Sequence, residues 1–124
     1  MKYSTNVSSK KRTNRRNYYK ADSNKKRIFM SSKLDKNLRK NYDLKTIPLR
    51  KGDEVKITRG NHKGKVGKIV QISRKGMFLY INTVTFKKMK GDEAYSPVHP
   101  SNVEILKLVL TSERKLNLKI KEIR

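Results

Sequence analysis

Residues 51–70 read KGDEVKITRGNHKGKVGKIV, and their pattern indicates the fold of the chain most clearly. Apolar residues alternate with polar ones from Val55 onward, and a second apolar run begins at Val66. Such alternation is typical of half-buried β-strands. Gly60 and Gly64 stand between the two runs, and glycine tolerates the backbone angles of a tight turn. The stretch therefore predicts two strands joined by a glycine turn.

Three more apolar runs follow on the C-terminal side. They cover residues 77–81, then a short run that ends at Phe86, and finally Val103 with Ile105. β-Branched and aromatic residues dominate these runs, and we expect the rings of Tyr80 and Phe86 to lie in the core. Short strands joined by glycine-containing turns are typical of a small barrel that closes its own edges. We therefore predict a mainly β body.

A segment before this body has the spacing of a short helix. Residues 32–42 place Leu34, Leu38 and Tyr42 four residues apart, which puts them on one helical face. Ser32 stands where its hydroxyl would cap the first turn. We expect the apolar face to dock on the β body, because that is how a short amphipathic helix buries its apolar side chains.

A second helix is predicted at the C-terminal end, over residues 112–123. Thr111 or Ser112 would cap it, since both carry the side-chain oxygen that such a position favours. Three apolar residues recur on one face of this helix: Leu116, Ile120 and Ile123.

The chain carries a large and unevenly distributed positive charge. Its 124 residues contain 33 Lys and Arg against 10 Asp and Glu, so the formal net charge is +23. Residues 1–51 have a net charge of +14 and residues 52–90 one of +8, whereas residues 91–124 are nearly neutral at +1. Self-repulsion of this size destabilises a compact state unless a polyanion offsets it. The charge indicates a nucleic acid as partner, and an anionic membrane surface is the next alternative.

Residues 1–27 are expected to form an extended arm that is disordered when the protein is alone. Basic residues alternate there with Asn, Ser and Thr, and the segment has almost nothing apolar to fold around. Tyr18 and Tyr19 lie inside the basic run, where a tyrosine can stack on an exposed base. The chain is thus predicted to divide into a basic N-terminal extension (1–47), the β body (48–106) and a C-terminal helical extension (107–124).

The composition excludes or disfavours several classes of function. There is no cysteine, and His62 and His99 are the only histidines, so we expect no metal site. The adjacent carboxylates Asp53-Glu54 and Asp92-Glu93 would point to opposite faces of a strand, which makes them poor candidates for acid–base catalysis. We therefore predict no enzyme, no cofactor and no small-molecule substrate. No apolar run reaches the roughly 20 residues that span a bilayer, so no membrane insertion is expected. His99, which precedes Pro100, is expected to stabilise a loop.

The stretch from residue 51 to residue 70 resembles the KOW motif, which forms part of an SH3-like barrel in RNA-associated proteins. Sequences on both sides extend the resemblance to one family over roughly residues 10–110: Ala21, Lys25-Lys26-Arg27, Met30-Ser31, Leu34, Leu38-Arg39, Tyr42, Ile47–Lys51 and Val98–Val103. That family is the universal large-subunit ribosomal protein number twenty-four, in its archaeal and eukaryotic form (number twenty-six in eukaryotes). The resemblance implies a small SH3-like barrel with a basic N-terminal extension, which contains a short helix, and with a C-terminal helix.

The resemblance also implies a structural constituent of the large ribosomal subunit. Such a protein would bind and stabilise folded large-subunit ribosomal RNA in its 5′ region, near the polypeptide exit tunnel, and would support subunit assembly. Its partners would be this RNA and neighbouring ribosomal proteins, and it would not form a homo-oligomer. It would work on cytoplasmic ribosomes and, in a eukaryote, pass through the nucleolus during assembly. The alternatives are a KOW-type transcription elongation factor and a general basic nucleic-acid-binding protein.

Two groups of residues are candidate RNA-binding positions, because cationic side chains neutralise phosphates. The residue types alone indicate basic side chains of the arm and of neighbouring segments: Lys10, Lys11, Arg12, Arg15, Arg16, Lys20, Arg39 and Lys68. The resemblance implies the positions that match the family's motif: Lys25, Lys26, Arg27, Arg50, Lys51, Arg59, Asn61, His62, Lys63 and Lys65. The glycines predicted to form the turns of the body are Gly52, Gly60, Gly64 and Gly67.

Overall fold

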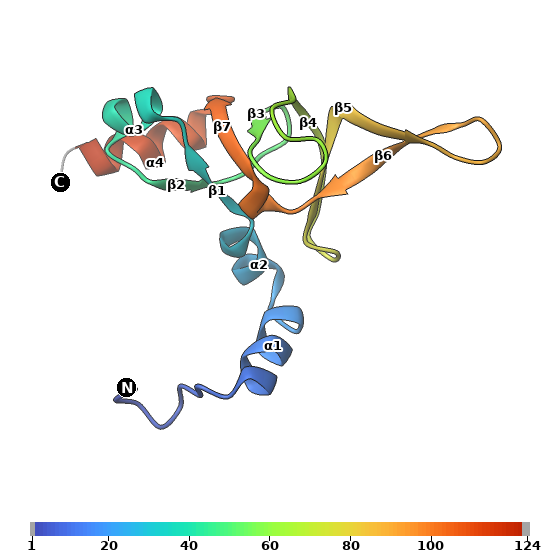
Figure 1. Cartoon of the computed structure of the whole chain (residues 1–124). Helices are drawn as coiled ribbons and strands as arrows, with labels where there is room; N and C mark the ends of the chain where they lie inside the picture. The colour runs from blue at the N-terminus through green and yellow to red at the C-terminus, as the bar shows by residue number, and fades with distance from the viewer. Residues whose placement is uncertain (1, 123–124) are drawn as a thin grey trace.

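The structure is a computed structural model that describes residues 2–122 (Figure 1). Its helices are α1 (Lys11–Tyr19), α2 (Ser23–Phe29), α3 (Lys36–Tyr42) and α4 (Ser112–Glu122), with a short 3-10 turn at Pro100–Asn102. Its strands are β1 (Ser31–Leu34), β2 (Thr46–Pro48), β3 (Glu54–Ile57), β4 (Val66–Ser73), β5 (Phe78–Lys87), β6 (Glu93–Val98) and β7 (Val103–Lys107).

The seven strands form one sheet in the order β2-β1-β7-β3-β4-β5-β6. Every pairing is antiparallel except that of β1 with β7, which is parallel. In the centre of the sheet Val55 of β3 lies between Ile105 of β7 and Gly67 of β4. The mainly β class is confirmed, with short helices before the sheet and one helix after it, as in a small SH3-like barrel.

The core is one apolar cluster built from alternate residues of these strands. Period-2 alternation puts every second side chain of a strand on the same face, and that face is the buried one in β3, whose burial alternates along Glu54–Ile57. Met30 and Leu118 join the cluster from the end of α2 and from α4. Seven members have no exposed surface at all: Leu34, Val55, Leu79, Ile81, Val84, Val103 and Ile105.

The predicted helix over residues 32–42 is wrong in its first third. Ser32 lies in β1, where its hydroxyl donates a hydrogen bond to the carbonyl oxygen of Pro100, so it is no helix cap. The helix begins later, after Asp35, whose carboxylate accepts from the backbone N–H of Asn37. Leu34 is buried as a strand residue rather than as part of a helical stripe. Two strands, β1 and β2, thus join the sheet from inside the predicted N-terminal extension.

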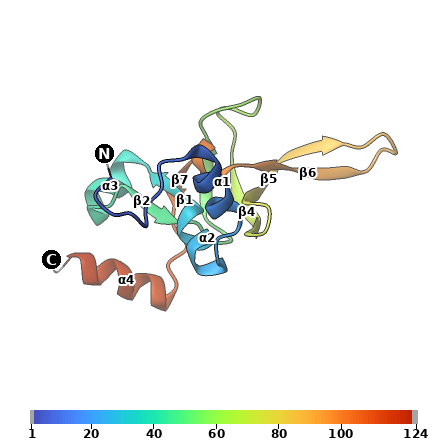
Figure 2. The same ribbon diagram turned by 90° about the horizontal axis from the view of Figure 1, so that it is seen from below.

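The third and fourth apolar runs form a single strand, β5, instead of two. Its partner β6 has no counterpart among the predicted strands, because the Glu93–Val98 segment leaves most of its side chains partly or fully exposed and has no clear apolar alternation. The two strands make a hairpin that projects from the body on the side away from α3 and α4 (Figures 1 and 2). Phe86 lies on this hairpin and is 49% exposed, so the prediction that it belongs to the core is wrong. Tyr80 is half-buried.

The C-terminal helix is confirmed. Leu116 is 61% exposed, whereas Arg114 and Leu118 are buried. These two residues are four apart and therefore share a helical face. The side chains of Ile120 and Ile123 lie outside the part of the chain that the structure describes.

The basic arm is helical rather than extended over most of its length. Residues 11–29 contain neither glycine nor proline, so nothing in that segment disfavours helix strongly. Neither α1 nor α2 has a buried residue. Figure 1 shows the two helices extending away from the sheet, and in Figure 2 α1 lies in front of the body. Contacts of Tyr18 with His99 and of Ser23 with Arg74 connect the arm to the body.

Candidate nucleic-acid interface

The glycine turn over residues 58–65, here called the KOW turn, joins β3 to β4 and faces open space. The N–H of Ile57 donates to the carbonyl of Lys65, and the N–H of Gly64 donates to the carbonyl of Ile57, which closes the base of the turn. Gly60 and Gly64 have φ angles of 98° and 88°, and a Cβ built on either would meet nothing within 4 Å. The predicted turn at these two positions is therefore confirmed.

The side chains on this turn are accessible to a large ligand. Arg59, Asn61, Lys63 and Lys65 are exposed, and His62 is half-buried. Beside the turn lies a small hollow with a volume of about 210 Å³. It is lined by residues of the turn on one side and by β6 and the 3-10 turn on the other: Arg59, Asn61, His62, Pro97, His99 and Asn102.

Of the other two predicted turn glycines, one lies in a strand and one in a turn. Gly67 lies inside β4 and has no positive φ angle, so its assignment to a turn is wrong. A Cβ at this position would come within 2.5 Å of side-chain oxygens of Asn82 and Thr83, which explains why the strand carries glycine here. Gly52 does lie in a turn, with φ of 93°, and a Cβ there would stand 3.1 Å from Val109.

A basic groove of about 730 Å³ lies on another part of the surface, at the junction of α2 with the sheet. Arg27 enters it from α2, Arg50 and Lys51 from the segment before β3, and Arg74 from the turn after β4. No Asp or Glu is among its lining residues. The groove thus gathers four cationic side chains from three segments that are distant in sequence.

Sequence reasoning identifies three of these cations and misses Arg74. Its Nη1 donates to the hydroxyl of Ser23 at 2.9 Å, which links the β4–β5 turn to the start of α2. The available signal is the basic pair Arg74-Lys75 next to Gly76, a combination like that of the KOW turn. The contact with Ser23 spans 51 residues and has no signature in the sequence.

Arg50 is held in position by the start of α4. Its Nη1 donates to the hydroxyl of Thr111 at 3.0 Å, and its Nη2 lies 3.5 Å from the carboxylate of Glu113. Glu113 is largely exposed, so water and salt weaken this ion pair. The guanidinium is therefore held beside the start of α4, while its charge stays largely available to a phosphate.

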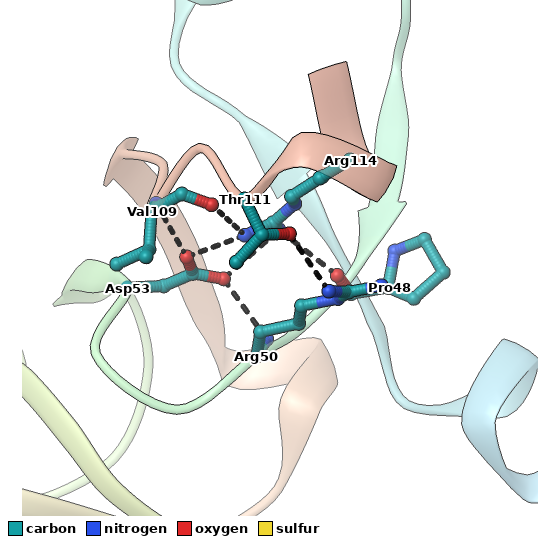
Figure 3. A network of polar contacts seen from close by, with 6 residues as sticks. All are labelled: Pro48, Arg50, Asp53, Val109, Thr111 and Arg114. Atoms are coloured by element: carbon teal, nitrogen blue, oxygen red, sulfur yellow. Dashed lines mark hydrogen bonds and ion pairs between the residues drawn. The ribbon is translucent and has the colours of Figure 1, made fainter. Parts of the chain in front are cut away.

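A buried ion pair between Asp53 and Arg114 fixes the segment that carries Arg50 and Lys51 (Figure 3). Asp53 is fully buried and accepts four hydrogen bonds: from the backbone N–H groups of Arg50 and Val109 and from both Nη atoms of Arg114. Arg114 also donates to the carbonyl oxygens of Pro48 and Val109. Asp53 thus has a structural role, and every one of these bonds lies at the junction of the sheet with α4.

The predicted RNA-binding residues of the arm are spread along α1 and α2. Lys26 is half-buried, and the others are exposed: Lys10, Lys11, Arg12, Arg15, Arg16, Lys20, Lys25 and Arg27. Lys68 is also exposed, on β4. Arg39 differs from the rest, because its Nε donates to the carbonyl of Leu34 at 2.7 Å and so stabilises the start of α3.

His99 connects the arm to the body. Its Nδ1 accepts from the N–H of Ser101, which leaves the proton of the neutral ring on Nε2. Nε2 lies 3.3 Å from the hydroxyl oxygen of Tyr18 on α1 and can donate to it. His99 therefore stabilises its loop, as predicted, and also anchors α1. Burial raises the pKa of the Tyr18 phenol above its ordinary value of 10.0, and the neighbouring Tyr19 raises it further.

Within residues 2–122, none of the helices is long and apolar enough to cross a membrane. In that same range no three His, Asp or Glu side chains come together in a way that could hold a metal ion.

The sequence is similar to ribosomal proteins over nearly its whole length. Residues 8–121 match the family described as ribosomal proteins L26 of eukaryotes and their archaeal counterparts, which carry the number 24. Among the relatives, the large ribosomal subunit protein uL24 of Littorina littorea is 40% identical over 116 residues, which are 93% of this chain and 81% of that protein. The uL24 protein of Dictyostelium discoideum is 40% identical over 121 residues, which are 98% of this chain and 87% of that protein. The chain therefore belongs to the uL24 family of large-subunit ribosomal proteins, in the form that archaea and eukaryotes share.

Proposed function

We propose that this protein is a structural constituent of the large ribosomal subunit and binds folded large-subunit ribosomal RNA through its basic surface. Membership of the uL24 family supports a location in the large ribosomal subunit. The net charge of +23 supports an RNA partner, since a polyanion removes the self-repulsion of the free protein. The protein would then act in the cytoplasm on ribosomes and, in a eukaryote, enter assembling subunits in the nucleolus.

The observation that carries this proposal is the groove with four cationic side chains. Arg27, Arg50, Lys51 and Arg74 come from three separate segments and line one groove, whose lining residues include no Asp or Glu. A surface that only kept the protein soluble would interleave charges of both signs. Arginine forks match the geometry of phosphate oxygens, so the groove is suited to a turn of the RNA backbone.

The arm and the KOW turn would add further contacts to those of the groove. The arm presents exposed cations along α1 and α2. Proteins that recognise RNA helices by shape contact their phosphates, and these cations would make such contacts. Gly60 and Gly64 leave the KOW turn free of side-chain bulk, so its backbone can approach RNA closely. The bound region would be the 5′ part of the RNA, near the polypeptide exit tunnel, with other ribosomal proteins as neighbours.

Binding by phosphate neutralisation fixes the expected salt dependence. If roughly 8–10 Lys and Arg side chains contact phosphates, the logarithm of affinity falls with the logarithm of salt concentration at a slope of about −6 to −9. Selectivity would come from the folded shape of the RNA rather than from base pairs. The protein has a role in assembly in this proposal because it joins RNA segments that are not yet held together.

Sedimentation of cell extract on a sucrose gradient tests this function directly. The protein is expected to co-migrate with large subunits and with whole ribosomes at physiological salt. A competition assay between large-subunit ribosomal RNA and duplex DNA of equal length separates this function from general nucleic-acid binding. Equal competition by the two polymers, together with migration at the top of the gradient, would reject the proposal.

A further inference from the structure

A second hollow, between α1 and α2, is built differently from the basic groove. Its volume is about 640 Å³. The rings of Tyr18 and Phe29 form an apolar wall, and the amides of Asn14 and Asn17 lie on the α1 side. Lys20 and Lys25 contribute cations, and Asp22 contributes one carboxylate. Aromatic rings, amides and cations therefore line the same space.

The aromatic wall is held in place by contacts that do not involve a ligand. The rings of Tyr18 and Phe29 are stacked, with centroids 5.4 Å apart and an angle of 24° between their planes. Tyr19 meets Tyr18 edge-on at 5.3 Å. The hydroxyl of Tyr18 lies 3.3 Å from Nε2 of His99 on the body. The wall is thus positioned before anything binds, which lowers the entropic cost of binding.

The wall also leaves apolar surface in water. Phe29 is 44% exposed, and its neighbour Ile28 is 64% exposed. Adjacent exposed apolar side chains with a polar rim mark binding sites more often than single ones do. The rim here carries two lysines and two amides, and only one acid. A partner for this hollow must therefore combine a flat apolar face, hydrogen-bonding edges and negative charge.

We propose that the hollow between α1 and α2 binds one unpaired nucleotide of the RNA. Its base would lie on the ring of Phe29, and the amides of Asn14 and Asn17 would hydrogen-bond to its edge, as amides do with base edges. Asp22 would accept from an exocyclic amino group. Lys20 and Lys25 would pair with the flanking phosphates. This inference rests on the proposed RNA-binding function and adds to it a site that reads a single base.

An apolar side chain of a neighbouring protein fits the hollow less well. It would fill the space against Phe29 but would leave the amides of Asn14 and Asn17 without partners and the lysines without counter-charges. Buried polar groups left unpaired cost free energy. A nucleotide satisfies all three kinds of lining group at once, and the positive charge of the surrounding arm attracts it.

Crosslinking of the unmodified protein tests the site without any substitution. Irradiation of assembled large subunits at short ultraviolet wavelengths joins stacked bases to aromatic side chains. After digestion by trypsin, a nucleotide is expected on the peptides of residues 17–20 and 28–33, which carry the tyrosine pair and Phe29. Absence of nucleotide from both peptides, in subunits where other peptides of this chain are crosslinked to RNA, would overturn the inference.

A pair of matched substitutions tests the same site in solution. Phe29→Leu removes the stacking face and keeps apolar bulk, while Phe86→Leu does the same to an exposed ring on the distant β5–β6 hairpin. The probes are an unstructured 12-nucleotide RNA and a 12-base-pair RNA duplex. Stacking on an aromatic ring contributes to the affinity for unpaired bases, so Phe29→Leu is expected to weaken single-strand binding by roughly five- to tenfold. Duplex binding should stay within about twofold, and Phe86→Leu should leave both unchanged.

The salt dependence distinguishes stacking from charge. Phe29→Leu should leave the slope of log affinity against log salt unchanged, whereas Lys25→Ala should reduce its magnitude by about one. Thermal unfolding of each variant checks that the fold is retained. Equal weakening of strand and duplex, or no weakening at all, would overturn the nucleotide site alone. Failure of the unmodified protein to bind either RNA at physiological salt would instead overturn the proposed function.

Discussion

Asp53 and Arg114 form a two-pronged ion pair in the core, with Nη1 of the arginine 2.7 Å from one carboxylate oxygen and Nη2 3.0 Å from the other. The residues are 61 positions apart and join the turn before β3 to the first turn of α4. The remaining contacts of both groups go to the backbone. The pair therefore fixes the path of the chain on which Arg50 and Lys51 reach the basic groove.

Loss of one partner of this pair should destabilise the protein strongly. A buried charge without its counter-charge costs about 3–5 kcal/mol, so Arg114→Ala is expected to lower the free energy of unfolding by about that much. Lys115→Ala, at the next and exposed position, is the control and should change stability by less than about 0.5 kcal/mol. Urea unfolding followed by circular dichroism measures both. A loss below about 1 kcal/mol for Arg114→Ala would contradict the role assigned to the pair.

Gly67→Ala should also destabilise the fold, through overlap rather than loss of charge. The new Cβ would stand 2.6 Å from Cγ2 of Ile81, which is fully buried, and 2.5 Å from Oδ1 of Asn82. Asn82 cannot move freely, because its Oδ1 accepts from the N–H of Lys68 at 3.0 Å. Overpacking of this kind costs about 1–3 kcal/mol.

A double substitution tests that explanation. Asn82→Ala opens part of the space around residue 67, so the combined loss of stability for Gly67→Ala with Asn82→Ala should be smaller than the sum of the two single losses. Thermal unfolding of the three variants gives the comparison. Additive losses would mean that contact with Asn82 is not what excludes a side chain from position 67.

Arg74→Ala should weaken RNA binding although no family motif points to this residue. Removal of one phosphate contact is expected to lower affinity for large-subunit ribosomal RNA and to reduce the magnitude of the salt slope by about one. Lys107→Ala is the matched control, since Lys107 is exposed but paired with Glu54 outside the groove. Filter binding across a series of salt concentrations measures both quantities. Equal effects of the two substitutions would indicate that only total charge matters.

Ionisation of the Tyr18 phenol at alkaline pH should weaken the contact between the arm and the body. Burial and the neighbouring Tyr19 raise its pKa above 10.0 in the folded protein. The neutral phenol is therefore favoured by folding, and its contribution to stability is present below pH 10 and is lost as pH rises through the raised pKa. The difference between the titration curves of the unmodified protein and Tyr18→Phe, followed by tyrosinate absorbance, should have its midpoint above about pH 10. A midpoint below that value would contradict the partly buried position of this ring.

How far the sequence predicts this structure depends on the range of the interaction involved. The alternation of Val55 with Ile57 and the similar run after Val66 predict β3 and β4, because period-2 burial is a local property of a strand. The KOW turn follows in the same way from Gly60 and Gly64.

Long-range contacts cannot be predicted from local pattern. The buried face of α4 is set by Arg114, which a hydrophobic pattern marks as a surface residue, and only its distant partner Asp53 explains its burial. Strand β1 has few apolar residues and is stabilised by pairing with β2 and β7. Tertiary pairing thus overrides the helical spacing that begins at Leu34 and the helix cap predicted at Ser32.

The candidate interface is predictable in part for the same reason. The basic character of residues 1–51 and of the KOW turn is a property of composition, and the family resemblance adds Arg27, Arg50 and Lys51 as specific positions. The grouping of these residues with Arg74 depends on the fold, which brings the turn after β4 against Ser23. The hollow between α1 and α2 likewise requires two helices where the composition indicates an extended arm.

Chemical footprinting of lysines in intact large subunits shows whether the basic N-terminal part of the chain contacts RNA. Each lysine is acetylated in the free protein and in the subunit, and the ratio of the two rates gives its protection. RNA contact through the leading part of the chain predicts strong protection of Lys25, Lys51, Lys63 and Lys65, with Lys115 still reactive. Protection of Lys115 while the other four lysines react as they do in the free protein would contradict it.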